Sequence, residues 1–488
     1  MSKTTYISHP NPKYKGNPFI EALGYPLTPS KLQKSCEEGF DSQIDLSGIP
    51  EEHHGYYKRS LLMNLFEVRV CQDEAVRIYE IIRHSIEFSY AHRNPLSPEM
   101  NKLLAAIERD KDLPLKAVNI KRLNLFNQSL CYLLYGISGR GKSTMAGQVL
   151  EPIQQKIPHT EYRNVNGELV ACEFTQITYI YVVVADRKSQ KSFLISVIEA
   201  IDEAIDEEIE GYVTEVRAES YAYIARNYNT TELLTFIRKL VVIHAVGVVV
   251  IDEAQNIAKS PPDLKIGSNE KPSMKFIEEV FNQIGCSLFF IGTMATFELF
   301  SQQMTTTRRA IRQGSMGLVS CDLNSSFWIR FCKSILKTEV LANQVTEEPL
   351  LIRYLHEKTA GIPAIAVSLV QSALSFLTFY PEKDQNLSTD FLDYIFKQYF
   401  IALQEVIDAL IDGEYHLFED LKPLLKLQRV KDRIQDNESN GIRSLMTGEV
   451  EEKPPQTGNK HEVDISNASK KVGMDALMQV VSAGEEGC

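Results

Sequence analysis

One octapeptide, Gly136-Ile-Ser-Gly-Arg-Gly-Lys-Ser143, restricts the fold of this 488-residue chain more than any other segment. It matches the pattern GxxxxGK[ST] in full, and it stands between a short apolar run at residues 130–135 and a helical pattern at residues 144–150. In such a strand–loop–helix unit, glycines let backbone N–H groups turn toward phosphate oxygens, and the helix N-terminus adds positive potential. The sequence therefore predicts a phosphate-binding loop; a glycine-rich turn with only a structural role is the alternative.

The polar positions of this loop have expected partners on a bound nucleotide. Lys142 would reach the β- and γ-phosphates, and the hydroxyl group of Ser143 would enter the coordination shell of Mg²⁺. The expected ligands are therefore ATP and Mg²⁺. The residues predicted to bind the nucleotide are Gly136, Ser138, Gly139, Arg140, Gly141, Lys142, Ser143, Thr144 and, from the motif described next, Asp252.

A second motif ends a strongly apolar run. Residues 246–251 are followed directly by Asp252 and Glu253. Two carboxylates at the end of a buried strand are costly unless a bound cation compensates their charge. We expect Asp252 to hold Mg²⁺ together with Ser143, and Glu253 to polarise the attacking water as a general base. The alternative is an acidic pair that only caps the following helix.

Two further segments carry candidate catalytic groups. The apolar run that ends at Ile291 is followed by Gly292 and Thr293, whose hydroxyl group could sense the γ-phosphate or the lytic water. An ordinary helix N-cap is the alternative for Thr293. After the next helix come Arg308 and Arg309, which could reach the γ-phosphate of a neighbouring subunit as an arginine finger. The pair could equally contact DNA or form a solvated basic patch, and the sequence does not distinguish between the two arginines.

Short apolar runs alternate with helical patterns through the middle of the chain. The runs lie at residues 130–135, 177–184, 246–251 and 287–291. Helical stretches between them are expected at residues 191–205, 231–244 and 273–284. This alternation predicts an α/β fold with a parallel sheet that helices cover on both faces.

Composition divides the chain into five predicted parts. These are an extended N-terminal arm at residues 1–50, a helical N-terminal region at 51–125, the α/β nucleotide-binding core at 126–324, a helical lid domain at 325–430 and a polar tail at 431–488. The arm is rich in proline and glycine, but it contains one apolar island, Phe19–Leu23, that could dock on another surface.

Charge and hydropathy exclude several classes of protein. The 52 Lys and Arg residues against 64 Asp and Glu residues give a net charge of −12, which excludes general affinity for nucleic acid or anionic membranes but not a local basic patch. No apolar run reaches the roughly 18 residues of a membrane span, and the N-terminus lacks the apolar core of a secretory signal. The 8 cysteines are scattered and indicate reduced thiols. We therefore expect a cytoplasmic protein without membrane contact.

Together these motifs resemble those of an AAA+ P-loop ATPase with a helical lid. A narrower similarity points to the TnsC family, the ATP-dependent regulators of Tn-seven-type transposons. It extends over about residues 15–410. The segments that carry the narrower similarity are Asn17–Leu23, Tyr90–Pro95, Gly247–Gln255, Phe290–Thr293 and the pair Arg308-Arg309.

The resemblance implies an ATP-dependent regulator of DNA transposition. Such a protein self-associates as rings or filaments on double-stranded DNA and links a TniQ-type target selector to transposase subunits of the TnsA/TnsB type. ATP hydrolysis would control disassembly and target choice. One departure concerns the lid arginine that AAA+ proteins place near residues 361–364, because position 364 is alanine. This departure favours slow hydrolysis and a switch-like enzyme.

DNA contact needs cations that a ring can repeat around the duplex. Arg187, Lys188 and Lys191 lie just beyond the second apolar run, where loops of related rings line the pore. A few cations per subunit suffice if an oligomer repeats them, and contacts to phosphates alone give low sequence selectivity. A solvated turn is the alternative, and the lysine-bearing loop at residues 259–271 is a second candidate.

Three other classes fit parts of the sequence. An AAA+ or STAND-type signalling or remodelling ATPase would oligomerise without DNA, but such chains usually append repeats or an effector domain. A secretion-associated ATPase shares a similar acidic strand end but usually carries a membrane segment. A scaffold that binds ATP and hardly hydrolyses it is the third class; Glu253 argues against it, whereas Ala364 argues for it.

Overall fold

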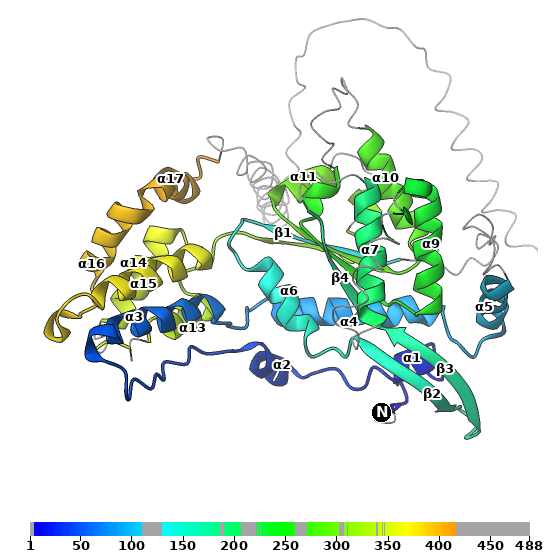
Figure 1. Cartoon of the computed structure of the whole chain (residues 1–488). Helices are drawn as coiled ribbons and strands as arrows, with labels where there is room; N and C mark the ends of the chain where they lie inside the picture. Colours follow the sequence, from blue (N-terminus) through cyan, green and yellow to red (C-terminus); the bar gives the residue numbers. More distant parts are fainter. Residues whose placement is uncertain are drawn as a thin grey trace, which may run out of the picture. The chain divides into compact units, whose positions relative to one another are not determined.

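A five-stranded parallel sheet forms the centre of the computed structural model (Figure 1). Its strands, in spatial order, are β4 (Tyr179–Val183), β5 (Val248–Asp252), β6 (Ser287–Gly292), β1 (Cys131–Gly136) and β7 (Ser315–Leu318). The four apolar runs of the sequence form β1, β4, β5 and β6, so the predicted α/β fold with a parallel sheet is confirmed. The sequence did not predict β7, because four residues that include a glycine give no periodic pattern.

The structure describes most of the chain up to residue 415. The described residues are 4–109, 129–185, 190–205, 221, 223–224, 226–258, 271–301, 307–309, 311–337, 340–343, 345 and 347–415. Residues 1–428 form one compact unit; the second unit, 429–488, and with it the predicted tail, lies outside the described residues. Among the described helices, none combines the length and the apolar character that a membrane crossing needs. The seven cysteines in the described part are all buried free thiols.

Alternate residues of the central strands face opposite layers of helices. In β1, Tyr132 and Leu134 pack toward one layer, and Leu133 and Tyr135 pack toward the other, as the two-residue period of a strand requires. The first face is covered by α4 (Ala75–Ala91) and α6 (Lys142–Leu150). The second face is covered by α7 (Gln190–Ile205), α9 (Thr230–Ile243), α10 (Lys271–Gln283) and α11 (Met294–Ser301) (Figure 1).

The N-terminal segment packs on the core. Besides α4, its helices are α1 (Pro18–Glu21), α2 (Pro29–Cys36), α3 (Glu51–Leu62), the 3-10 helix η1 (Met63–Glu67) and α5 (Pro98–Arg109). Phe19, in the apolar island of the predicted arm, is fully buried, and its ring packs against Tyr90 of α4 and against Phe174. The apolar island therefore docks on the core of its own chain.

A two-stranded antiparallel hairpin lies between α6 and β4 in the chain. It consists of β2 (Lys156–Arg163) and β3 (Leu169–Ile177). The hydroxyl group of Tyr162 donates a hydrogen bond to the Glu21 carboxylate at 2.6 Å, so the hairpin is tied to α1. The sequence did not predict this hairpin, because its strands are largely polar and Pro158 argues against a strand. In a sheet of only two strands, each strand has a free edge that accommodates a proline.

Helices make up most of the described residues from 326 to 412, as predicted for this part of the chain. They are α13 (Ser326–Ile335), α14 (Glu348–Thr359), α15 (Pro363–Leu377), η4 (Glu382–Asp384), α16 (Thr389–Ile395), the π-helix η5 (Phe396–Phe400), η6 (Ile401–Leu403) and α17 (Gln404–Asp412). Gly361 separates α14 from α15 with a left-handed φ of 65°, and Pro363 then starts α15 at the position where its missing N–H costs nothing.

A buried arginine satisfies backbone carbonyl groups where α9 leads into β5. Arg93 is 1% exposed. Its guanidinium group donates to the carbonyl oxygen of Val241 at 3.1 Å and to that of Val246 at 2.6 Å, and its Nε donates to Ser89 at 2.9 Å. The planar fork of arginine reaches three carbonyl groups at once, which a lysine ammonium group cannot do in the same geometry.

We expect Arg93→Ala to lower the free energy of unfolding by about 3 kcal/mol, because buried carbonyl groups lose the hydrogen bonds of a charged donor. Arg93→Lys should recover only part of this loss. The control is Lys333→Ala, which removes an exposed ion pair with Glu348 and should cost less than about 0.5 kcal/mol. Urea unfolding followed by circular dichroism measures these differences; equal stability of Arg93→Ala and wild type would show that water replaces the guanidinium group.

Candidate nucleotide-binding site

The phosphate-binding loop joins β1 to α6 in the conformation that its glycines permit. Gly139 and Gly141 have φ angles of 77° and 86°, in the left-handed region that glycine adopts without strain. At Gly136, a side chain has no room, because a Cβ atom there would lie 2.0 Å from the carbonyl oxygen of Leu318. The loop therefore closes tightly on β7 and directs the N-terminus of α6 toward the place predicted for the phosphates.

Lys142 is the first residue of α6, and its ammonium group folds back on the loop. Its Nζ donates to the carbonyl oxygens of Gly136 at 3.1 Å and Ile137 at 2.9 Å. Burial lowers the pKa of Lys142 to about 8, although the negative charges of Glu253 and Asp252 act in the opposite direction. The loop and the acidic strand end, which are far apart in the sequence, thus meet at this lysine.

Asp252 ends β5 with both carboxylate oxygens hydrogen-bonded. Its Oδ2 accepts a hydrogen bond from the hydroxyl group of Tyr181 at 2.6 Å, and its Oδ1 accepts one from the backbone N–H of Glu253 at 2.8 Å. Burial, followed by the bond to Asp252, raises the pKa of Tyr181, whereas a hydrogen bond with Ser143 lowers it. Tyr181 therefore lies between the two residues that were predicted to bind Mg²⁺.

This donor set fits a magnesium ion. Mg²⁺ takes oxygen ligands, and it is usually held by one or two protein groups together with water and substrate phosphates. Ser143 and Asp252 supply such oxygens beside one phenol group. In the part of the chain that the structure describes, no group of three or more His, Cys, Asp or Glu side chains could hold a metal by itself.

Glu253 and Thr293 meet through a glutamine. Glu253 follows β5 in a left-handed conformation with φ of 54°. The side-chain amide of Gln255 donates to the Glu253 carboxylate, and its carbonyl oxygen accepts from the backbone N–H of Thr293 at 3.1 Å and the hydroxyl group of Thr296 at 3.0 Å. The sequence did not predict roles for Gln255, Thr296 or Tyr181. Tyr181 lies within an apolar strand run and Thr296 within a helical pattern, and Gln255 only follows the acidic strand end.

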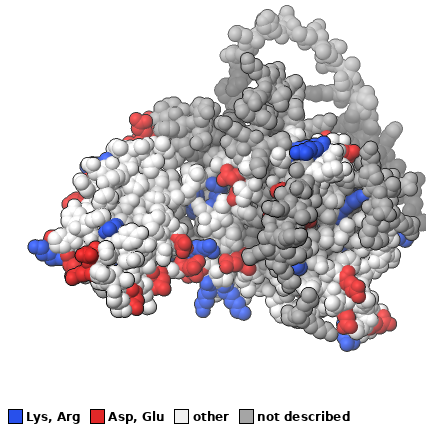
Figure 2. All heavy atoms as spheres, in the orientation of Figure 1, with Lys and Arg blue, Asp and Glu red and all other residues white. Residues whose placement is uncertain are grey.

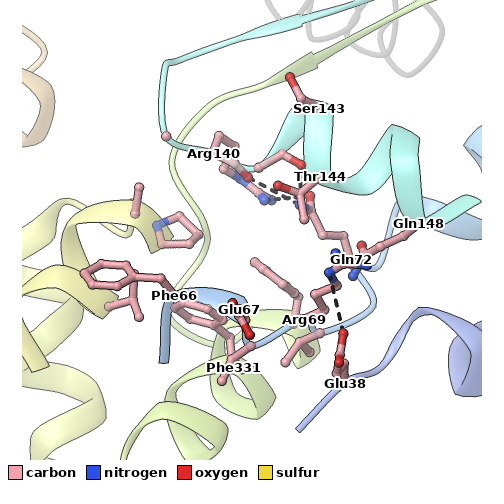
Figure 3. A pocket seen from close by; sticks show the side chains of 18 of the residues that line it. Glu38, Phe66, Glu67, Arg69, Gln72, Arg140, Ser143, Thr144, Gln148 and Phe331 are labelled. Carbon is pink, nitrogen blue, oxygen red and sulfur yellow. Dashed lines mark hydrogen bonds and ion pairs between the residues drawn. The ribbon is translucent and has the colours of Figure 1, made fainter. Parts of the chain in front are cut away.

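A cavity of about 860 Å³ opens beside the loop. Figure 3 shows Arg140, Ser143 and Thr144 on one side of it and Phe66 and Phe331 on another. The start of α15 closes it near the loop, because the backbone N–H of Ala364 donates to the carbonyl oxygen of Gly139 at 3.2 Å. The remaining lining comes from Glu38, η1 and the segment after it, α6, α13 and α15; it includes Val68, Arg69, Gln72, Gln148, Phe327, Pro363 and Val367.

Arg140 anchors the loop to the segment before α4. Its Nη1 donates to Gln72 at 2.9 Å, its Nη2 lies 3.4 Å from a Glu74 oxygen, and its guanidinium group lies 5.2 Å from the Phe327 ring centre. Gln72 in turn donates to the carbonyl oxygen of Gly141 at 3.0 Å. The side chain of Arg140 thus has structural partners beside the nucleotide contact predicted for it.

The remaining predicted residues are spread over the surface or lie outside the described residues. Arg308 is exposed and Arg309 is half-buried, between α11 and β7 in the chain. Lys191 is half-buried in the first turn of α7. Arg187 and Lys188 lie outside the described residues, as do residues 259–270.

Comparison with protein families finds an AAA domain over residues 126–300. Together with the parallel sheet and the phosphate-binding loop, this match confirms the predicted fold class, an AAA+ P-loop core with a helical N-terminal region and a helical lid. A search of curated proteins gave no match.

Three solved structures illustrate how distant the structural likeness is. The ORC2 protein of Aeropyrum pernix, in ADPNP–ADP complexes, shares 13% identity over 62% of this chain and 68% of its own, with a TM-score of 0.34. The Walker-type ATPase PABY2304 of Pyrococcus abyssi shares 15% identity over 69% of this chain and 75% of its own, with a TM-score of 0.34. Domain III of the Thermotoga maritima replication initiation protein DnaA shares 12% identity over 62% of this chain and 93% of its own, with a TM-score of 0.27. Likeness at this level carries no argument about function.

We expect nucleotide affinity to fall at alkaline pH. The lowered pKa of Lys142, about 8, leaves much of its amine neutral above that pH, whereas nucleotide phosphates favour the charged ammonium form. Binding should therefore take up a proton above pH 8, and the affinity should fall by up to about tenfold per pH unit there.

Calorimetry in two buffers of different ionisation enthalpy, at pH 7.5 and pH 9, measures this proton uptake. Lys142→Arg is the control, because arginine stays charged throughout this range. Equal affinity of the wild-type protein at both pH values would contradict the expected role of Lys142.

Proposed function

We propose that this chain binds ATP with Mg²⁺ and hydrolyses it, and that it works as an ATP-dependent regulator of DNA transposition. The observation that carries the ATPase part is the meeting of Lys142 with Asp252 and Glu253 at the phosphate-binding loop. A buried lysine beside two carboxylates and a helix N-terminus suits a ligand that brings its own negative charge and its own cation.

Under this proposal, the side chains predicted from the two motifs and from Thr293 have these roles in hydrolysis. Lys142 exchanges its bonds to the loop carbonyls for bonds to the β- and γ-phosphates. Glu253 accepts the proton of the water that attacks the γ-phosphorus. The hydroxyl group of Thr293 contacts that water or the γ-phosphate. Ser143 and Asp252 would hold Mg²⁺, which would neutralise phosphate charge.

The cavity beside the loop gives the base of the nucleotide a place. Its volume of about 860 Å³ lies in the range of ligand sites. Phe327 and Phe331 supply apolar faces for a base. Thr144, which follows the loop, also lines the cavity. Because Ala364 packs directly on Gly139, a change in the loop on nucleotide binding acts on α15, and so on the lid.

Assembly on DNA follows from the resemblance to the TnsC family. In a ring or filament, the exposed Arg308 or the neighbouring Arg309 would complete the site of the next subunit. Figure 2 shows acidic and basic side chains interspersed on the face in view, and the described residues of that face form no extended basic surface. Binding to double-stranded DNA therefore depends on a few cations, Lys191 with Arg187 and Lys188, that the assembly repeats.

The assembled protein would couple two partners. One is a TniQ-type target selector, and the other consists of transposase subunits of the TnsA/TnsB type. Slow hydrolysis suits this task, because the lifetime of the assembly on DNA then sets the time in which the partners meet. The alanine at position 364, where other AAA+ proteins carry an arginine, supports slow hydrolysis.

We expect Lys142→Ala to weaken ATP binding by about 100-fold or more, because two charge-assisted hydrogen bonds to phosphate are lost. Glu253→Gln should keep ATP affinity within about twofold and lower kcat by about 10²- to 10⁴-fold. Fluorescence titration with a labelled nucleotide and a phosphate-release assay measure the two effects. Hydrolysis by Glu253→Gln at the wild-type rate would show that another group is the base.

We expect the wild-type protein to bind duplex DNA with ATP and to release it with ADP, whereas Glu253→Gln should stay on DNA with ATP. Charge reversal at Lys188 and Lys191 should weaken DNA binding at unchanged ATP affinity, and added salt should weaken the wild-type complex in the same way. Electron micrographs and sedimentation with duplex DNA measure assembly. ATP-dependent assembly that ignores DNA would favour a signalling ATPase instead.

A further inference from the structure

We propose that Gln255 is a positioning residue of the ATPase site, which fixes the carboxylate of Glu253 and links it to the end of β6. This inference rests on the proposed ATPase function, because it concerns the group that activates the attacking water. Gln255 lies in η3 (Ala254–Ala258), directly after the acidic strand end.

Hydrogen bonds determine which way the Gln255 carboxamide points. Two donors, the backbone N–H of Thr293 at 3.1 Å and the hydroxyl group of Thr296 at 3.0 Å, face one of its two terminal atoms. That atom must be the carbonyl oxygen, because an amide nitrogen has no acceptor capacity. The amide N–H₂ group therefore faces Glu253, whose carboxylate accepts its hydrogen bond. Reversal of the carboxamide would place its N–H₂ group against the backbone N–H of Thr293 on one side and its oxygen against the Glu253 carboxylate on the other.

The end of β6 is shaped to receive this side chain. A Cβ atom at Gly292 would lie 2.0 Å from the hydroxyl oxygen of Thr296 and 2.6 Å from the carbonyl oxygen of Gln255. Thr296 itself is fully buried. Glycine at position 292 thus leaves the space in which strand β6, α11 and η3 meet around one carboxamide.

Glu253 needs such a partner, because its backbone is in an uncommon conformation. Its φ of 54° lies in the left-handed region, which a residue with a side chain adopts only when its surroundings hold it there. The bond from Gln255 holds the side-chain end of the same residue. The Glu253 side chain is thereby held at its backbone and at its carboxylate, which lies near the ammonium group of Lys142.

The hydrogen bond from Gln255 to Glu253 matters during ATP hydrolysis. As the water oxygen bonds to the γ-phosphorus, the bond from that phosphorus to the β–γ bridging oxygen breaks, and Glu253 receives the proton that the water loses. Gln255 exchanges no proton in this step. It holds the carboxylate oxygen of Glu253 in place. It also fixes this oxygen relative to Thr293, the predicted contact to the γ-phosphate. Loss of Gln255 should therefore lower kcat and spare nucleotide affinity.

The test compares steady-state kcat and ATP affinity for Gln255→Ala, Thr296→Val and the double variant. We expect Gln255→Ala to lower kcat by about tenfold and Thr296→Val by about threefold, with ATP affinity within about twofold of wild type. The double variant should be no slower than Gln255→Ala, because Thr296 acts only through the carboxamide. Gln255→Glu should be at least as slow as Gln255→Ala, since its charge repels Glu253.

Gln33→Ala is the matched control, because Gln33 also donates its amide N–H to a glutamate, Glu37 at 3.0 Å, but on the exposed surface of α2. It should leave kcat and ATP affinity unchanged. Wild-type kcat in Gln255→Ala, additive losses in the double variant, or a parallel loss of ATP affinity would each overturn the positioning role. A wild-type protein that neither binds nor hydrolyses ATP would overturn the proposed function, and this inference with it.

Discussion

The buried ammonium group of Lys142 is the constraint around which the site is arranged. A cation that is 8% exposed needs compensating partners. Two carbonyl oxygens of its own loop supply part of this compensation, and the carboxylates of Asp252 and Glu253 add to it from the end of another strand, although burial still lowers the pKa of Lys142. The charge balance therefore joins two segments that the sequence separates by a full strand–helix unit and the β2–β3 hairpin.

Sheet order explains why these segments meet. In a parallel sheet the carboxyl ends of all strands lie at one edge, and ligands of α/β proteins bind there. Strand β6 lies between β1 and β5, so the phosphate-binding loop, the Gly292–Thr293 corner and the Asp252–Glu253 pair occupy neighbouring positions along this edge. The central strand thus separates the loop from the acidic pair, and Gln255 bridges the gap between β5 and β6.

The sequence predicted what depends on local pattern. Continuous apolar runs marked β1, β4, β5 and β6, because strands buried on both faces need them, and the GxxxxGK[ST] motif marked the loop. The sequence did not predict the β2–β3 hairpin or β7, since a half-exposed ribbon and a four-residue edge strand carry little apolar pattern. It did not predict the roles of Tyr181 and Gln255 for a different reason. Their partners, Asp252 and Thr293, are fixed by strand order and register, which no single segment encodes.

Two of the segments that resemble the TnsC family, Asn17–Leu23 and Tyr90–Pro95, lie outside the phosphate site and contact each other. Asn17 donates its side-chain amide to the backbone carbonyl of Tyr90 at 2.7 Å, and Asn94 donates to the carbonyl oxygen of Gly16 at 3.1 Å. The buried carboxylate of Glu21 then joins α1 to the hairpin through Tyr162. Most residues of segment 17–23 are thus buried in contacts that join the arm to α4 and to the hairpin. A partner that recognises the arm must therefore use side chains beside this segment, because the segment itself is already covered by its own chain.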